Sequence, residues 1–283
     1  MRRRHVSLLA AISAAAGHAL AATEAGPVDH SPYVPPGCVL EWHDEFDEPI
    51  RPEDWLTIHR PPRRGGWLIH DRSAVQHADG HLLLMAFEQD REVLAGWITT
   101  QASYRRRHGY FETKVRLPTE VGLRAAAWLM SPVLGREFDR PDRSGAEAQL
   151  FSFLPAAPAD RRLSQGVYWN PYEGTPYLST NRSGLVQTLS NAPPQRWAGT
   201  MVEMPAGATN GDPCVFGLLW TERSYVFSVN GRPTFWTARG VSQVPQFLSI
   251  ALLPPPRTPQ RPIALELPMT VRVDYVRVYA PPP

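Results

Sequence analysis

Short runs in which hydrophobic and polar residues alternate recur along the chain from about residue 38 onward. They cover residues 81–86, 109–117, 225–229 and 271–279. Strict alternation over such lengths is typical of β-strands with one buried face. The third run leads into Asn230-Gly231, a strong signal for a tight hairpin turn. The pattern therefore predicts an all-β domain, either a sandwich or a barrel.

Helical signals are missing from the same region. No window of a dozen residues after residue 21 keeps the 3.6-residue period of an amphipathic helix. The chain has 30 prolines, which favour loops and sheet edges because proline interrupts helices. We expect one all-β domain over residues 38–280, a flexible lead-in over residues 22–37 and a tail over residues 281–283.

The first 21 residues have a different pattern. Arg2, Arg3 and Arg4 precede an apolar run over residues 6–16, and Ala19-Leu20-Ala21 fits a small-residue cleavage site. The run is too short to cross a bilayer. The sequence therefore predicts a signal peptide over residues 1–21 and a secreted or periplasmic protein without a membrane span. A short N-terminal helix is the alternative interpretation.

Charge and cysteine content limit the partners. The formal net charge of +2 falls to −1 once the three arginines leave with the signal peptide, so a nucleic-acid partner is not indicated. Cys38 and Cys214 could form one disulfide in an exported protein or remain two free thiols. No His or Cys cluster has metal-ligand spacing, so the residues imply no cofactor.

One strand-like run, SGAEAQLFSF over residues 144–153, carries an acid at Glu147. Strict alternation places Glu147, Gln149 and Phe151 on one face of a half-buried strand and Ala148, Leu150 and Ser152 on the other. A buried carboxylate is costly unless it is paired or hydrogen-bonded. Glu147 is therefore either a structural carboxylate or half of a catalytic pair. Retaining glycoside hydrolysis uses two carboxylates about 5–5.5 Å apart, and a β-bulge can keep residues five positions apart on one face.

Six segments, in this order, match the motifs of one enzyme family. They are EWHDEF at 41–46, HGYFETKVRLP at 108–118, GLRAAAWLM at 122–130, EAQLFS at 147–152, FGLLWT at 216–221 followed by VNG at 229–231, and VDYVRVY at 273–279. The chain resembles glycoside hydrolase family 16, the laminarinase-, lichenase- and agarase-like enzymes. The resemblance implies a concanavalin A-like jelly-roll β-sandwich of two antiparallel sheets with a concave ligand-binding face. It also implies a β-linked polysaccharide or oligosaccharide as the partner.

The resemblance breaks down at the catalytic strand. Glu147 matches the nucleophile, whereas Gln149 stands where the family has a helper aspartate. The acid/base glutamate is replaced by Ser152, or by Phe151 if the strand has no bulge. Neither side chain can protonate a leaving oxygen, and losing a positioned general acid costs about 10²–10⁴-fold in rate. We therefore expect a protein that acts on or binds a β-linked polysaccharide, with hydrolysis weakened or lost.

Two alternatives stay open. The first is an active retaining endo-glycosidase or transglycosylase that uses Glu147 as nucleophile and an acid from elsewhere. Candidate acids are Glu137, Asp139 and Asp142 in the charged run before the strand and, less favoured, Asp160 and Glu173. The second is a structural or assembly protein of an exported polysaccharide system that binds no free glycan.

Three aromatic residues and one arginine are the candidate sugar contacts. Trp97, Tyr168 and Trp169 could offer flat stacking surfaces. Arg124 stands where the resemblance would place a stacking tryptophan, and it could pair with an anionic or sulfated polysaccharide. The resemblance adds one structural calcium as the only cofactor, near Asp44, Glu45 and Asp274. Calcium needs six to eight oxygen ligands.

Overall fold

The fold is taken from a computed structural model of the chain. The structure describes residues 31–60, 66–137, 139–157, 160–169, 196–206, 208, 211–256 and 261–282, together with the backbone of residues 177–180 and 186–189. The chain divides into two units, Met1–Ser31 and Pro32–Pro283. The predicted signal peptide and residues 22–30 of the predicted lead-in lie outside the described residues.

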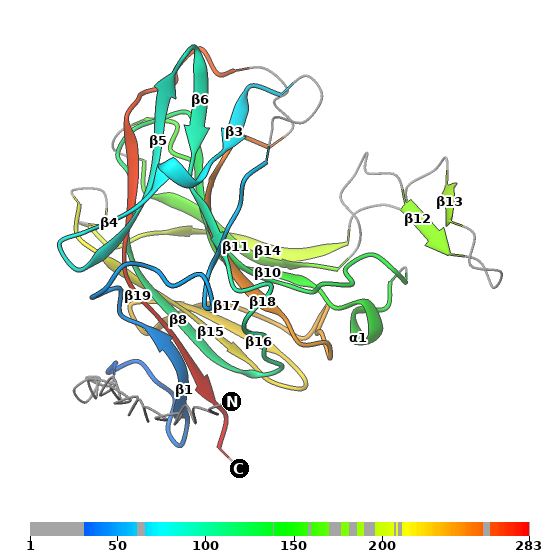
Figure 1. The fold of residues 1–283 in the computed structure, drawn as a ribbon. Helices are drawn as coiled ribbons and strands as arrows, with labels where there is room; N and C mark the ends of the chain where they lie inside the picture. The colour runs from blue at the N-terminus through cyan, green and yellow to red at the C-terminus, as the bar shows by residue number, and fades with distance from the viewer. Residues whose placement is uncertain are drawn as a thin grey trace, which may run out of the picture. The chain divides into compact units, whose positions relative to one another are not determined.

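The second unit is a sandwich of two large sheets (Figure 1). The ten-stranded sheet has the order β17-β16-β15-β8-β19-β5-β6-β3, with β1 paired to β19 and β4 paired to β5. These strands are β17 (Arg232–Thr237), β16 (Tyr225–Val229), β15 (Cys214–Trp220), β8 (Gly109–Arg116), β19 (Met269–Ala280), β5 (His81–Gln89), β6 (Glu92–Ala95), β3 (Leu68–His70), β1 (Val39–Asp44) and β4 (Val75–Ala78).

The seven-stranded sheet has the order β14-β11-β10-β9-β18-β7-β2. Its strands are β14 (Trp197–Glu203), β11 (Arg162–Tyr168), β10 (Glu147–Phe153), β9 (Arg124–Met130), β18 (Phe247–Leu253), β7 (Trp97–Thr99) and β2 (Leu56–Thr57). A separate hairpin joins β12 (Tyr177–Thr180) and β13 (Val186–Leu189). The described helical segments are a 3₁₀ turn, η1 (Arg72–Ala74), and a single turn, α1 (Pro141–Ser144). The all-β prediction is confirmed.

Local sequence explains the regular elements. The β16–β17 hairpin turns at Asn230 and Gly231, whose φ angles of 47° and 74° match the predicted turn with two left-handed residues. Strands pair antiparallel in both large sheets, apart from the parallel pair β3–β6. Long alternating runs supply the strands because every second side chain enters the core.

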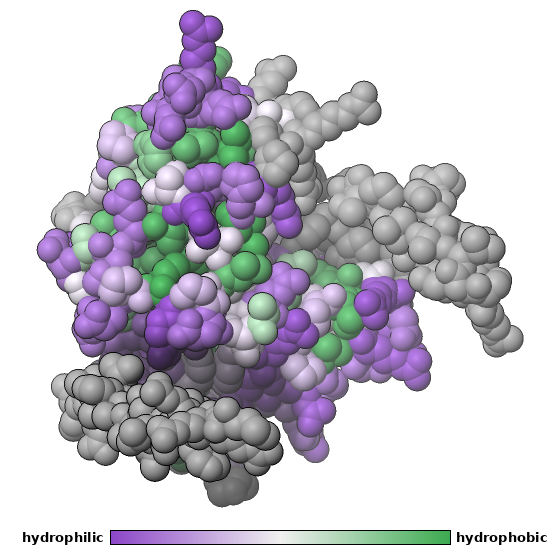
Figure 2. Space-filling view, viewed as in Figure 1, coloured by the Kyte–Doolittle hydropathy of each residue, from purple (hydrophilic) through white to green (hydrophobic). Residues whose placement is uncertain are grey.

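The core lies between the two sheets. Phe151 of β10 and Phe216 of β15 meet across it with ring centroids 4.4 Å apart, and Trp220 of β15 is completely buried. On the surface drawn in Figure 2, hydrophobic residues gather over the middle of the body and hydrophilic residues cover most of its rim. The sandwich therefore has hydrophobic residues in its core and also on parts of its surface.

Two further predictions concern cysteines and the membrane. Cys38 is half-buried and Cys214 is buried, and both are free thiols, so the structure favours the second of the two cysteine alternatives. Burial raises the pKa of each thiol, which makes them poor nucleophiles. Within the described residues no helix has the length and hydrophobicity needed to cross a membrane.

Candidate functional site

A β-bulge sets the geometry of the candidate catalytic strand. On β10, Gln149 is opposite Trp128 of β9, but the next pair joins Phe151 to Ala127, so Leu150 is an extra residue. Leu150 and Phe151 both enter the core. Glu147, Gln149 and Ser152 consequently share the face turned away from the core.

Two expectations about this strand are wrong. Strict alternation would have put Phe151 on the same face of the strand as Glu147. The bulge shifts the alternation by one residue, so Ser152 lies on that face instead. The strand is also fully buried rather than half-buried. Ser152 is therefore the residue that stands where the resemblance predicts the acid/base glutamate.

Neighbouring strands extend this surface, which we call the outer face. It consists of the side chains of the seven-stranded sheet that point away from the core. Cross-strand register orders them in rows: Trp197–Tyr168–Glu147–Met130–Phe247, then Gly199–Gly166–Gln149–Trp128–Ser249, then Met201–Ser164–Ser152–Ala126–Ala251–Trp97, with Arg124 and Leu253 beyond.

Glu147 is the acid at the centre of the outer face. Its side chain is only 4 % exposed, and Gln149 Nε2 donates a 2.8 Å hydrogen bond to its Oε1. Burial raises the pKa of Glu147, while the Gln149 bond and the charge of Arg124 lower it. A second carboxylate about 5 Å away would raise the pKa further by like-charge repulsion. Among the described residues no carboxylate contributes to the shift.

Arg124 projects toward the same centre from the start of β9. Its Nη1 donates a 3.4 Å hydrogen bond to Ser152 Oγ. Its Nε is buried and has no hydrogen-bond partner among the described residues. Burial lowers the pKa of the guanidinium, and the charge of Glu147 opposes this. The centre therefore combines one carboxylate, one guanidinium, an amide and a hydroxyl.

Aromatic side chains lie at one end of the outer face. Trp97 and Trp128 have ring centroids 5.7 Å apart, and the Arg60 guanidinium lies 5.1 Å over the Trp97 ring. His70 meets Trp97 edge-on at 5.0 Å, and burial lowers the pKa of His70 to about 4, so this imidazole is neutral at pH 7. The predicted contact Trp97 thus belongs to an aromatic cluster with the Arg60 guanidinium over one of its rings.

A second aromatic pair lies at the opposite end. Tyr168 stacks on Trp197 with centroids 6.2 Å apart and planes inclined by 19°. Trp197 is 52 % exposed. Trp197 was not predicted from the sequence, because its place on the outer face depends on the pairing of β14 with β11.

Trp169, the remaining aromatic prediction, is not on the outer face. It is 5 % exposed and packs in the core, and its Nε1 donates a 2.8 Å hydrogen bond to Asp139. Tyr168 is the last residue of β11, whereas Trp169 follows the strand and packs into the core, so only Tyr168 is available on the outer face.

The candidate replacement acids have local partners. Glu137 pairs with Arg143 at 3.4 Å, and Asp142 pairs with Arg140 at 2.7 Å. Asp139 accepts a 2.8 Å hydrogen bond from Trp169 Nε1. Asp160 caps its own loop by accepting from the backbone of Arg162 at 3.0 Å. Glu173 lies outside the described residues. Glu137, Asp142 and Asp160 are thus held by neighbours in their own loops, whereas Asp139 is held by Trp169, which follows β11.

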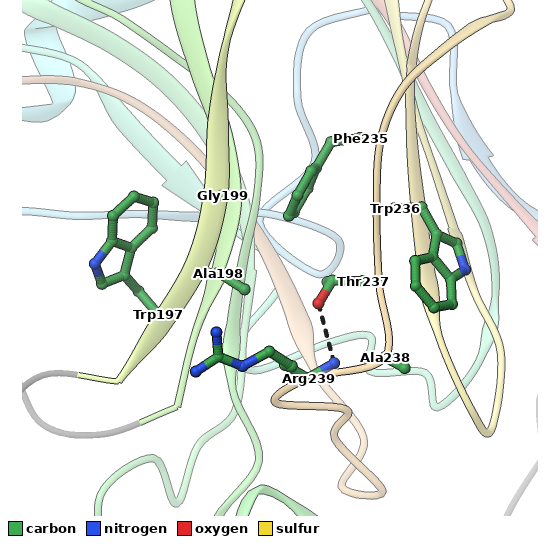
Figure 3. A pocket seen from close by; sticks show the side chains of 8 residues that line it. All are labelled: Trp197, Ala198, Gly199, Phe235, Trp236, Thr237, Ala238 and Arg239. Atoms are coloured by element: carbon green, nitrogen blue, oxygen red, sulfur yellow. Dashed lines mark hydrogen bonds between the residues drawn. The ribbon is translucent and has the colours of Figure 1, made fainter.

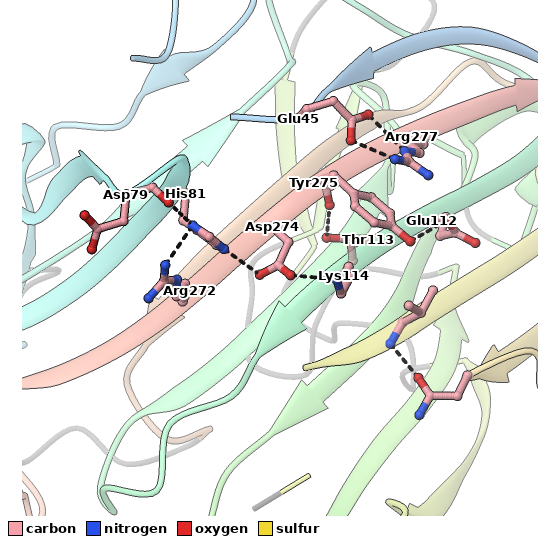
Figure 4. Close-up of polar contacts among 12 residues, drawn as sticks. Glu45, Asp79, His81, Glu112, Thr113, Lys114, Arg272, Asp274, Tyr275 and Arg277 are labelled. Atoms are coloured by element: carbon pink, nitrogen blue, oxygen red, sulfur yellow. Dashed lines mark hydrogen bonds and ion pairs between the residues drawn. The ribbon is translucent and has the colours of Figure 1, made fainter. Parts of the chain in front are cut away.

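The carboxylates suggested for calcium do not form one site. Figure 4 shows Glu45 and Asp274 engaged with different basic side chains along β19. Asp44 accepts a 2.8 Å hydrogen bond from Trp55 Nε1. Glu45 pairs with Arg277 at 2.8 Å, and Asp274 pairs with Lys114 at 2.9 Å. Among the described residues no group of three His, Cys, Asp or Glu side chains could hold a metal. These residues therefore do not fit the calcium implied by the resemblance.

A groove of about 500 Å³ opens elsewhere, between the edge strands β14 and β17. Figure 3 shows the Phe235 side chain and the Arg239 guanidinium directed into it, while the Trp197 and Trp236 rings turn to opposite sides. None of its lining residues is acidic. The groove lining includes Trp197 and Gly199 of the outer face but none of the polar residues of its centre.

Comparison with solved structures identifies the architecture. The laminarinase catalytic domain from Thermotoga maritima superposes with a TM-score of 0.63 at 18 % identity, over 86 % of this chain and 98 % of that one. A glycoside hydrolase family 16 endo-glucanase from Bacteroides ovatus superposes with a TM-score of 0.64 at 13 % identity, over 84 % of this chain and 99 % of that one. The fold is that of the family 16 glycoside hydrolases.

A third neighbour agrees with this assignment. The endo-β-1,3-glucanase from Pyrococcus furiosus gives a TM-score of 0.65 at 18 % identity, over 86 % of this chain and 94 % of that one. No protein-family model and no curated protein matches the sequence. The predicted jelly-roll sandwich is thus confirmed by structure, while the roles of individual residues rest on the site itself.

Proposed function

We propose that this protein binds a β-linked polysaccharide across its outer face and hydrolyses it weakly or not at all. The observation that carries the proposal is the bulged strand β10, which brings Glu147, Gln149 and Ser152 onto one face with a single carboxylate among them. A retaining mechanism needs a second carboxyl group to protonate the leaving oxygen. A serine hydroxyl does not supply that proton at neutral pH.

The surroundings of this centre support glycan binding. Stackable rings lie at both ends, Trp97 with Trp128 and Tyr168 with Trp197. Flat aromatic rings bind sugar faces at low entropic cost. Polar groups between them suit a ligand rich in hydroxyls. Among the described residues, the arrangement therefore favours affinity for a glycan and offers no second carboxyl group beside Glu147 for acid catalysis.

The solved neighbours support the ligand class. They include a laminarinase and endo-glucanases, and this chain shares their fold. We further infer that the chain is exported, since residues 1–21 have the composition of a signal peptide. The domain at 38–280 would then meet its polysaccharide outside the cytoplasm.

Affinity electrophoresis tests the proposal. The mature protein migrates through gels containing laminarin, lichenan, agarose or carrageenan, with a glycan-free gel as reference. Retardation on at least one glycan is expected. Unchanged migration on all four would contradict the proposal and favour the structural or assembly protein considered above.

A further inference from the structure

Gln165 lies directly opposite the bulge of β10. The register between β10 and β11 shifts between Gln149 and Ser152, and Gln165 is the one residue of β11 within the shifted stretch. Leu150 and Phe151 therefore share this single partner position. Gln165 is 1 % exposed and alternates along β11 with residues of the core cluster, so its amide points into the core. A buried amide is costly unless it is hydrogen-bonded.

The two ends of this amide bind to two bulges, one in each large sheet. Gln165 Nε2 donates a 2.7 Å hydrogen bond to the backbone carbonyl of Leu150, the residue that the bulge adds to β10. Gln165 Oε1 accepts a hydrogen bond from Thr234 Oγ1, which also lies 3.1 Å from the Phe227 carbonyl. Thr234 is the residue that the register of β17 against β16 skips. One buried side chain thus connects the bulge of β10 with the bulge of β17.

The hydrogen bond to Leu150 supplies what hydrophobic burial cannot. Burial of the Leu150 and Phe151 side chains favours a bulge at this point, but it does not satisfy the backbone. A bulge interrupts the regular ladder of hydrogen bonds, and a buried carbonyl oxygen needs a donor. The Gln165 amide is that donor. It therefore holds the backbone of β10 in one geometry between Gln149 and Ser152.

We propose that Gln165 is a positioning residue of the outer face. By holding the Leu150 carbonyl it fixes the bulge, and the bulge fixes Gln149 and Ser152 on the same face as Glu147. Gln165 lies on the core side of the sheet, so it acts on a ligand only through the backbone of β10. Polar groups that are already in place lower the ordering cost of binding. The consequence for glycan affinity rests on the proposed function.

Gln165→Met tests this role by removing the amide and keeping a flexible side chain that fills a similar space in the core. Hydrogen exchange of the backbone amides at residues 149–152 should become about ten- to hundredfold faster, because an unsatisfied buried carbonyl favours local opening. The dissociation constant for the glycan that the wild type binds should rise about two- to tenfold in affinity electrophoresis. A general loss of stability would instead speed the most protected amides of both sheets together.

Thr113→Val is the matched control. Thr113 is completely buried, and its Oγ1 donates a 3.1 Å hydrogen bond to the backbone carbonyl of Tyr275 in the ten-stranded sheet. Valine has nearly the same shape but no donor. The control variant therefore loses a hydrogen bond of the same kind in the other sheet. Exchange at residues 149–152 and glycan affinity should both equal those of the wild type.

A milder variant keeps the test decisive if Gln165→Met does not fold. Thr234→Val removes the partner of Gln165 Oε1 and retains the Leu150 bond, so it should speed exchange at residues 149–152 by a smaller factor. Thermal unfolding verifies that each variant is folded. Unchanged local exchange in the folded variants, or faster local exchange with unchanged glycan affinity, would overturn this inference while the proposed function stands. Faster local exchange in a protein whose wild type binds no glycan would overturn the proposed function and leave the control of the bulge by Gln165 in place.

Discussion

Replacing Trp197 by alanine tests the binding role of the outer face at its most exposed ring. Trp197 is 52 % exposed and stacks on Tyr168. Its open ring surface is available to a ligand without any rearrangement of the core. The substitution should therefore weaken glycan binding and leave the fold intact.

The expected loss follows from the exposed area. A tryptophan offers about 150–250 Å², and 52 % exposure leaves roughly 80–130 Å² of it open. A sugar covering one face of the ring would bury about half of that, or roughly 40–65 Å². At about 25 cal/mol per Å² this is about 1–1.6 kcal/mol. The dissociation constant should rise about five- to fifteenfold.

Affinity electrophoresis on the glycan that the wild type binds measures this change. Trp236→Ala is the matched control, because Trp236 is 62 % exposed but lies on β17 of the other sheet. Its affinity should equal that of the wild type. Equal losses for the two variants, or no loss for Trp197→Ala, would refute the assignment of binding to the outer face.

Three further variants probe strand β10. The double variant Gln149→Asp/Ser152→Glu restores both missing acids on one face and should release reducing ends faster than the wild type; an unchanged rate would show that the acids are not the only loss. Glu147→Gln should change how the free energy of unfolding depends on pH. Burial raises the pKa of Glu147 in the folded state. The wild-type free energy of unfolding therefore falls as the pH rises from the pKa of Glu147 in the unfolded chain through its pKa in the folded protein. Urea titrations should show a shallower fall in Glu147→Gln, and identical slopes would argue against a buried, charged Glu147. Phe151→Ala should cost about 3–5 kcal/mol of unfolding free energy by leaving a cavity between the sheets, and a loss below about 1 kcal/mol would contradict the inward orientation of Phe151.

Much of the fold could be predicted from local patterns. Alternation marks the strands because one face of each enters the core, and Asn230-Gly231 closes a hairpin because both residues tolerate positive φ. These signals act over a few residues, so the sequence displays them directly. These local patterns do not by themselves predict a jelly roll. That prediction also depended on finding six family motifs in the right order along the chain.

The candidate site was harder to predict because it depends on register between distant strands. The bulge at Leu150 leaves no mark of its own in the sequence, yet it decides whether Phe151 or Ser152 joins Glu147. In the sequence, Tyr168 and Trp169 look equally suitable as sugar contacts. Only the structure shows that Tyr168 lies on the outer face and Trp169 in the core. Trp197 becomes relevant only when β14 pairs with β11.

The release of reducing ends from the glycan that the protein binds tests the central claim most directly. The wild type is assayed beside Glu147→Gln, which keeps the other side chains of the outer face and removes the one carboxylate that the described residues place at its centre. We predict clear binding by the wild type and reducing-end release that is at most slightly greater than that of Glu147→Gln. Robust wild-type turnover that disappears in Glu147→Gln would contradict the account and establish an active retaining hydrolase.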